Sequence, residues 1–146
     1  MTIIVTGGAG FIGSNFIFYT LKKHPGYRII CLDKLTYAGN LSTLQSVMDR
    51  ENFRFVKMDI CDRDGVYQLF EEEHPDMVVN FAAESHVDRS IKNPEIFVQS
   101  NVMGTVNLLQ RAKEAWYDAD AKTWKEGKKY VQVSTDEVYG ALGAEG

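Results

Sequence analysis

Cysteine, proline, long apolar runs and positive charge are all scarce in this sequence. The two cysteines, Cys31 and Cys61, are too few for a disulfide framework and lack the spacing of a zinc site, so we expect no metal centre. No stretch approaches the ~18 consecutive apolar residues of a membrane helix. Sixteen basic against 20 acidic residues give a net charge of -4, which argues against an extended nucleic-acid surface. Because no targeting leader is visible either, we expect a cytoplasmic protein without a membrane or nucleic-acid partner.

Short β-branched runs and longer helical stretches alternate along the 146 residues, a length within the roughly 100–200 residues of one domain. The predicted strands cover residues 2–6, 28–33, 53–60, 77–81 and 130–134. The predicted helices cover residues 11–23, 41–48 and 95–116, with a further helix that Asp62 can cap and that ends before Pro75. We expect a loop from residue 82 to Pro94, and a solvated helix end and loop over 115–129. Apolar strands separated by helices predict an α/β fold with a doubly wound parallel sheet.

A glycine-rich loop joins the first predicted strand to the first predicted helix. Gly7, Gly10 and Gly13 form a G-x-x-G-x-x-G set, which allows a sharp turn and close approach to a pyrophosphate at a helix N-terminus. Asp33, 20 residues beyond Gly13, ends the second strand and can accept hydrogen bonds from ribose hydroxyls. Because an acid there repels a 2′-phosphate, the pattern favours NAD over NADP. A glycine turn that serves only packing is the alternative.

Four further stretches resemble the dTDP-glucose 4,6-dehydratase family, within the extended short-chain dehydrogenase/reductase enzymes. They are residues 33–41 (DKLTYAGNL), 82–90 (AAESHVDRS), 101–105 (NVMGT) and 134–140 (STDEVYG). The resemblance covers essentially the whole chain. It implies a Rossmann-like sheet truncated after its fifth strand, so that residues 1–146 form an incomplete NAD-binding domain. It also implies a dTDP-sugar substrate and a homodimer in the full-length protein.

The same resemblance and the loop pattern together give a set of expected cofactor contacts. These are Gly7, Gly10, Phe11, Ile12, Gly13, Asp33, Lys34, Leu35, Thr36, Asp59, Ile60, Phe81, Ala82, Ala83, Ser85 and Ser100. Asp59 is also open to interpretation as an ordinary strand-end acid. Ser85 is expected to approach the nicotinamide or the sugar. The polar pair Ser100 and Asn101 among apolar neighbours predicts an inward hydrogen bond. His86 and Arg89 receive no catalytic role.

The residues after the fifth predicted strand carry the chemistry that the resemblance implies. The family oxidises C4 of the sugar temporarily, eliminates water across C5 and C6, and returns the hydride to C6. Glu137 would remove the C5 proton, Asp136 would protonate the departing C6 hydroxyl, and Thr135 would hydrogen-bond the C4 oxygen. From the residues alone, a solvated pair of loop carboxylates is the alternative.

A Tyr-x-x-x-Lys pair on a following helix completes the site in this family. Neither Tyr130 nor Tyr139 has a lysine four residues on, and we expect the chain to lack the pair and to be inactive by itself. Two other functions stay open at this point: an NAD-binding module without chemistry, and a related enzyme such as a nucleotide-sugar epimerase. Asp136 and Glu137 favour the dehydratase over the epimerase, since related epimerases generally carry small residues there.

Overall fold

A five-stranded parallel sheet forms the centre of the molecule. The computed structural model describes residues 1–37, 39–135, 138, 140 and 143. The strands of the sheet are β1 (Thr2–Thr6), β2 (Arg28–Asp33), β3 (Phe53–Lys57), β4 (Met77–Asn80) and β7 (Lys129–Gln132). They lie in the order β3-β2-β1-β4-β7, and every neighbouring pair is parallel. The predicted α/β fold with a parallel sheet is therefore confirmed.

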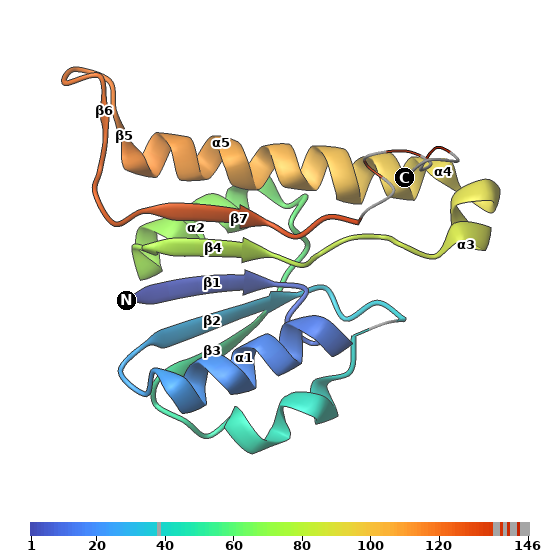
Figure 1. The fold of residues 1–146 in the computed structure, drawn as a ribbon, viewed down its shortest axis with the longest axis horizontal. Helices are drawn as coiled ribbons and strands as arrows, with labels where there is room; N and C mark the ends of the chain where they lie inside the picture. The colour runs from blue at the N-terminus through green and yellow to red at the C-terminus, as the bar shows by residue number, and fades with distance from the viewer. Residues whose placement is uncertain (38, 136–137, 139, 141–142, 144–146) are drawn as a thin grey trace.

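Helices cover both faces of this sheet (Figure 1). They are α1 (Phe11–Lys23) and the 3₁₀ helix η1 (Leu41–Val47) on one face, and α2 (Arg63–Glu73) and α5 (Thr105–Trp116) on the other. The alternation of strand side chains divides the core accordingly. Ile3 and Val5 of β1 pack with α1 and η1, whereas Ile4 packs with α2 and α5. Both faces are buried, which explains why the strands read as continuous apolar runs.

Three predicted strands differ from the observed ones at their ends. β3 stops at Lys57 instead of residue 60, because its partner β2 ends at Asp33, which lies opposite Lys57. β4 stops at Asn80 instead of residue 81. β7 covers Lys129–Gln132 instead of 130–134, because it pairs with the four residues of β4. In each case the strand ends where its paired neighbour ends. The residue pattern of one strand does not show the length of that neighbour.

Helical and hairpin elements also correct the sequence prediction. The expected loop before Pro94 contains α3 (Val87–Lys92), which buries no residue and therefore has no apolar periodicity. The expected helix over 95–116 is divided into α4 (Pro94–Phe97), a π-helical segment η2 (Val98–Gly104) and α5. The expected loop over 115–129 contains a short hairpin, β5 (Tyr117–Asp118) and β6 (Thr123–Trp124).

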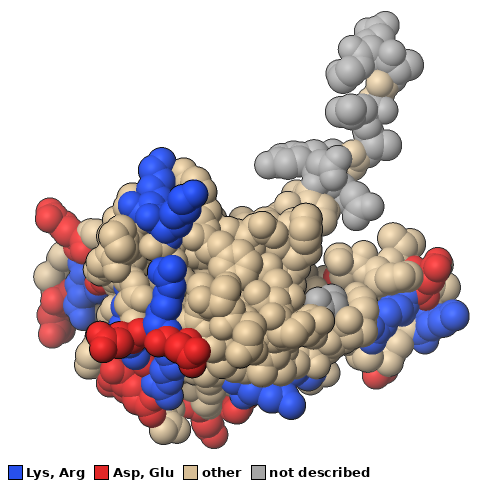
Figure 2. Space-filling model, turned by 90° about the horizontal axis from the view of Figure 1, so that it is seen from below, with Lys and Arg blue, Asp and Glu red and all other residues tan. Residues whose placement is uncertain are grey.

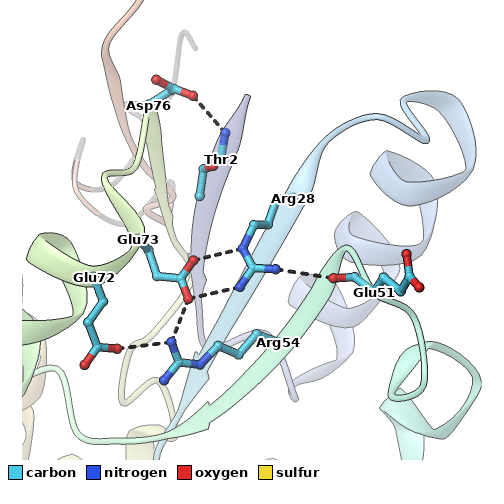
Figure 3. A network of polar contacts seen from close by, with 7 residues as sticks. All are labelled: Thr2, Arg28, Glu51, Arg54, Glu72, Glu73 and Asp76. Atoms are coloured by element: carbon cyan, nitrogen blue, oxygen red, sulfur yellow. Dashed lines mark hydrogen bonds and ion pairs between the residues drawn. The ribbon is translucent and has the colours of Figure 1, made fainter.

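A cluster of charged residues ties the amino ends of the strands to the end of α2 (Figure 3). Glu73 accepts hydrogen bonds from Arg28 Nε at 2.9 Å and from Arg54 Nη1 at 2.6 Å. This end of the sheet lies opposite the glycine-rich loop. The cluster therefore belongs to the frame of the fold and leaves the carboxyl ends of the strands free for a ligand.

Both cysteines are free, with Cys31 buried and Cys61 half-buried. Across the described residues, no helix has the length and apolar character that crossing a membrane requires. Within the same residues, no group of three or more His, Cys, Asp or Glu side chains is placed to hold a metal ion.

Candidate functional site

The glycine-rich loop brings the ends of β1 and β4 into close contact. Gly7 has a φ of +65°, and a Cβ there would lie 2.7 Å from the Ala82 nitrogen. A Cβ on Gly13 would overlap the Gly7 carbonyl oxygen and lie 2.8 Å from Gly8 Cα. Side chains are therefore excluded at both positions, as a phosphate-binding turn between strand and helix requires.

The N-terminus of α1 opens directly from this loop. Gly10 is its N-cap residue and provides no capping side chain, and the first turn of the helix contains no acidic residue. Backbone N–H groups and the positive end of the helix dipole are thus available to an anion.

Figure 2 looks onto the side of the molecule on which α1 and η1 lie. Charged side chains on this side gather toward the two ends of the molecule rather than over its middle.

Asp33 is a buried carboxylate at the end of β2, with 8% of its surface exposed. Its Oδ2 accepts a hydrogen bond from the Ala9 N–H at 2.9 Å, and its Oδ1 accepts one from the Leu35 N–H at 2.8 Å. Each carboxylate oxygen can accept a further bond. Asp33 is therefore fixed in place by the glycine-rich loop while keeping acceptor capacity for a ligand.

A pocket with a volume of about 130 Å³ lies at the carboxyl ends of β1 to β4. Most of the predicted cofactor contacts line it: Gly7, Asp33, Lys34, Thr36, Asp59, Ile60, Phe81, Ala82, Ala83 and Ser100. Carboxyl ends of strands at a change in strand order are where open α/β sheets bind ligands. Here β1 lies between β2 and β4, so the pocket is at that position.

The other predicted contacts lie outside the lining of the pocket. Phe11 and Ile12 are 85% and 62% exposed in the first turn of α1. Gly10 is the N-cap residue of α1 and Gly13 is buried in its first turn, whereas Leu35 is half-buried and Ser85 is exposed.

Four lining residues were missed by the sequence analysis: Leu32, Gly39, Met58 and Glu84. Three of them adjoin predicted residues. Leu32 precedes Asp33, Met58 precedes Asp59, and Glu84 lies between Ala83 and Ser85, so their neighbours could have indicated them.

Glu84 is the most unusual of the missed residues because it is a carboxylate with only 8% exposure. Among the described residues, its Oε2 has no hydrogen-bond partner, and Arg89 Nη1 lies 4.0 Å away. Arg89 in turn lies over the ring of Tyr37, 4.1 Å from its centroid. These contacts join the segment after β2 to the segment after β4 on one side of the pocket.

The π-helical segment holds Glu84 in place through Asn101. The Asn101 Oδ1 accepts a hydrogen bond from the Glu84 N–H at 2.8 Å, and its Nδ2 donates to the Glu84 carbonyl oxygen at 2.8 Å. Asn101 thus makes a hydrogen bond of the kind predicted for the pair Ser100 and Asn101, although the residue itself is exposed. Ser100, in the same segment, lines the pocket.

A polar network around Asn80 fixes the end of β4. Asn80 Nδ2 donates to Gln132 Oε1 of β7 at 2.9 Å, and Asn80 Oδ1 accepts from Thr6 Oγ1 of β1. The Ala82 N–H donates to the same Asn80 oxygen at 3.2 Å. Three strands are thereby held together beside the pocket, and the first residues after β4 are held against Gly7.

Lys34 and Asp59 form an ion pair across the pocket, with 2.6 Å between Lys34 Nζ and Asp59 Oδ2. Partial burial opposes ionisation of Asp59, but the Lys34 ammonium and the Cys61 N–H outweigh it and hold the pKa of this carboxyl below its ordinary value. The hydrogen bond to Asp59 raises the pKa of Lys34 in turn. Both groups are therefore charged at neutral pH.

The predicted catalytic residues are only partly described. Asp136 and Glu137 lie outside the described residues. Thr135 is exposed after the end of β7 and does not line the pocket.

One correction concerns the Tyr-x-x-x-Lys spacing, which the chain does contain once, at Tyr19 and Lys23. Lys23 Nζ donates to Tyr19 Oη at 2.9 Å. The two residues lie in the second half of α1, and neither lines the pocket. They therefore do not take the place of a pair on a helix after the fifth strand of the sheet.

Comparison with known proteins gives consistent matches over nearly all of the chain. A family model described as GDP-mannose 4,6 dehydratase matches residues 4–146. A dTDP-glucose 4,6-dehydratase from Xanthomonas campestris pv. campestris (strain B100) is 50% identical over 145 residues, which are 99% of this chain and 40% of that protein. The chain thus spans about 40% of the length of this relative.

Solved structures agree with these matches. A dTDP-glucose 4,6-dehydratase from Bacillus anthracis in complex with NAD matches with a TM-score of 0.81 and 44% identity, over 100% of this chain and 41% of that one. A dTDP-glucose 4,6-dehydratase from Streptomyces venezuelae with NAD bound has a TM-score of 0.83 and 43% identity, over 99% of this chain and 42% of that one.

Proposed function

Since the chain belongs to the GDP-mannose 4,6-dehydratase family, we propose that it forms the NAD-binding part of a dTDP-glucose 4,6-dehydratase. The whole protein would convert dTDP-glucose into dTDP-4-keto-6-deoxyglucose and water. One observation carries the proposal: the glycine-rich loop and the buried Asp33 carboxylate meet at the pocket where β1 lies between β2 and β4. The identity to known dehydratases supports the choice of reaction.

The residues present fit NAD. Gly7 and Gly13 leave no room for a side chain, and the uncapped N-terminus of α1 suits the pyrophosphate. Asp33 would accept hydrogen bonds from the adenosine ribose, and Asp59 with Ile60 would lie beside the adenine. Phe81, Ala82, Ala83 and Ser85 would lie toward the nicotinamide. Bound NAD would supply a reversible hydride acceptor.

Three residues after β7 would handle protons of the sugar. Glu137 would remove the proton from C5 once C4 is a ketone, because the ketone acidifies that position. Asp136 would protonate the departing C6 hydroxyl, which leaves as water. Thr135 would donate a hydrogen bond to the C4 oxygen. Support comes from their position in the sequence, shortly after the parallel strand β7, and from the resemblance of residues 134–140 to the family.

We also propose a homodimer for the full-length protein. Val98, Val102, Val106 and Leu109 follow one another at helical spacing on η2 and α5 and are 45–55% exposed. A row of this kind supports contact between helices of two subunits.

We further propose a cytoplasmic location, since the free thiols of Cys31 and Cys61 fit a reducing compartment.

A version of the protein extended to the length of its relatives tests the function. With NAD and dTDP-glucose it is expected to release a product that has lost one water, as measured by mass spectrometry. The Asp136→Asn variant is expected to oxidise C4 but to eliminate water about 10²–10⁴-fold more slowly. Elimination at an unchanged rate would contradict the role of Asp136.

The 146-residue chain alone is the companion experiment, and we expect it to form no 4-keto sugar. A measurable rate from this chain would show that the reaction needs nothing beyond residues 1–146.

A further inference from the structure

Two neighbouring residues at the end of β2 favour different dinucleotides, one NAD and the other NADP. Asp33 favours a ribose with free hydroxyls, because a carboxylate accepts their hydrogen bonds and repels a 2′-phosphate. Lys34 follows immediately, and a cation beside the ribose is what accommodates that phosphate in NADP-binding proteins. The sequence pattern favours NAD through Asp33, and the contacts of Lys34 decide whether this cation opposes that preference.

The Lys34 ammonium is held by the neighbouring strand end. Lys34 Nζ lies 2.6 Å from Asp59 Oδ2, and both residues line the pocket. This ion pair directs the Lys34 ammonium toward the end of β3. A carboxylate paired with a lysine ammonium offsets the attraction of that ammonium for a nearby phosphate.

Asp59 itself is well anchored, so it can fix the position of Lys34. Its Oδ1 accepts a hydrogen bond from the Cys61 N–H at 3.0 Å. The next carbonyl, of Ile60, accepts from Asn107 Nδ2 of α5 at 2.7 Å, and Cys61 Sγ donates to the Gln99 carbonyl oxygen at 3.1 Å. The turn that carries Asp59 is therefore attached at two points, to α5 and to η2.

Gly104 adds a third restraint on the same turn. A Cβ at Gly104 would lie 2.5 Å from two carbons of the Ile60 side chain, so the end of η2 packs directly on Ile60. Lys34, by contrast, is 56% exposed and has a long flexible side chain. In this pair the carboxylate is the fixed partner, and the lysine is the one whose position can change.

We propose that Asp59 determines the preference for NAD over NADP by holding the Lys34 ammonium away from the 2′ position of a ribose bound at Asp33. The inference rests on the proposed NAD-binding function and adds a positioning residue to it. Asp33 excludes the phosphate directly. Asp59 removes the one cation that follows Asp33 in the chain and that would otherwise attract the phosphate.

Dissociation constants of the chain for NAD and NADP test this proposal in four forms: wild type, Asp59→Asn, Lys34→Met and the double variant. The ratio of the NADP constant to the NAD constant is the readout. Both dinucleotides carry the same adenine, so any lost adenine contact cancels in the ratio. Asp59→Asn is expected to shift the ratio about tenfold toward NADP, because the freed ammonium can pair with the phosphate.

The double variant separates the role of Lys34 from simple repulsion by Asp59. We expect it to return to the wild-type ratio, because the lysine that causes the gain is absent. A gain that persists without Lys34 would overturn the proposal, and so would an unchanged ratio in Asp59→Asn. Lys34→Met gives a measurement that does not depend on Asp59→Asn folding. Its ratio should equal that of the wild type, and a further loss of NADP affinity would overturn the proposal.

Failure of the underlying function gives a different result. If the wild-type chain binds neither dinucleotide, the proposed NAD-binding function is wrong, and the inference falls with it. If NAD binds and only the ratios fail to change as expected, the inference alone is overturned.

Discussion

The main-chain N–H of Ala9 donates a 2.9 Å hydrogen bond to Oδ2 of Asp33, although the two residues are 24 positions apart. This bond joins the turn after β1 to the end of β2. It places the loop that suits a pyrophosphate and the carboxylate that suits a ribose in one rigid arrangement. The two parts of a dinucleotide-binding signature therefore support each other within the fold.

The first prediction concerns Asp33. Replacing it by Ala leaves the N–H groups of Ala9 and Leu35 without their acceptor, and a buried unsatisfied group costs about 1–3 kcal/mol. We expect Asp33→Ala to lower the free energy of unfolding by about that amount and to weaken NAD binding at least about tenfold. Urea denaturation and a binding titration measure the two effects. The exposed Asp49→Ala is the control, and an equal effect there would contradict the role of Asp33.

The second prediction concerns the close packing of the glycine-rich loop. Gly13→Ala places a Cβ against the Gly7 carbonyl and is expected to cost about 1–3 kcal/mol of stability through overpacking. NAD binding should be lost as the turn shifts.

Gly26 provides the matched control, because nothing lies within 4 Å of a Cβ built there. Gly26→Ala should leave NAD binding intact and change stability by less than about 1 kcal/mol. If Gly13→Ala behaved like Gly26→Ala in both measurements, the tight turn would not be needed.

The third prediction concerns Asn101, whose side chain bonds both the N–H and the carbonyl of Glu84. Asn101→Ala removes both bonds, so the segment after β4 should lose its fixed position beside the pocket. We expect faster hydrogen exchange at the Glu84 amide and an NAD dissociation constant raised about tenfold, the effect of one or two net hydrogen bonds. Gln110→Ala on the exposed side of α5 is the control, and no difference between the two variants would refute the role of Asn101.

Much of this site could be predicted from the sequence because its parts depend on local chemistry. The bounds of β1 and β2 follow from short apolar runs, and those of α1 follow from helical spacing after the glycine-rich turn. The cap of α2 is as predicted, with Asp62 Oδ1 accepting from the Gly65 N–H at 3.0 Å.

Other features depend on contacts that a single sequence does not display. The end of β3 is set by the end of β2, and α3 has no buried face to produce a periodic pattern. The π-helical segment η2 has the same apolar spacing as an α-helix, so the sequence does not show its wider i→i+5 hydrogen-bond pattern. The pairing of Lys34 with Asp59 joins two strand ends 25 residues apart and is likewise visible only in the fold.

The fourth prediction concerns pH and the cluster at the amino ends of the strands (Figure 3). The hydrogen bond from Arg28 is the largest influence on Glu73 and, with that from Arg54, outweighs burial and holds the pKa of the Glu73 carboxyl below its ordinary value. A carboxyl whose folded pKa is depressed stabilises the fold above its unfolded pKa, and this contribution is lost as the pH falls through the folded value. The free energy of unfolding should therefore decrease as the pH falls below about 4.5.

Glu73→Gln tests this account. Because both arginines are about 40% exposed, the network is worth only about 1 kcal/mol at neutral pH. We expect the variant to lose about that amount at pH 7 and to show a flatter decrease in stability below pH 5, as measured by urea denaturation across pH. The more exposed Glu72→Gln should have a smaller effect. A slope equal to that of the wild type would mean that Glu73 does not carry the acid sensitivity.

The central claim is that the pocket at the carboxyl ends of β1 to β4 binds NAD, and the position of binding tests it most directly. Nuclear magnetic resonance of the ¹⁵N-labelled chain, titrated with NAD, reports on each backbone amide. We predict saturable shifts at Gly7, Ala9, Asp33, Asp59 and Ala82, while the cluster around Glu73 at the opposite end of the sheet stays unchanged. Absence of shifts, or shifts concentrated away from the glycine-rich loop and Asp33, would contradict the claim.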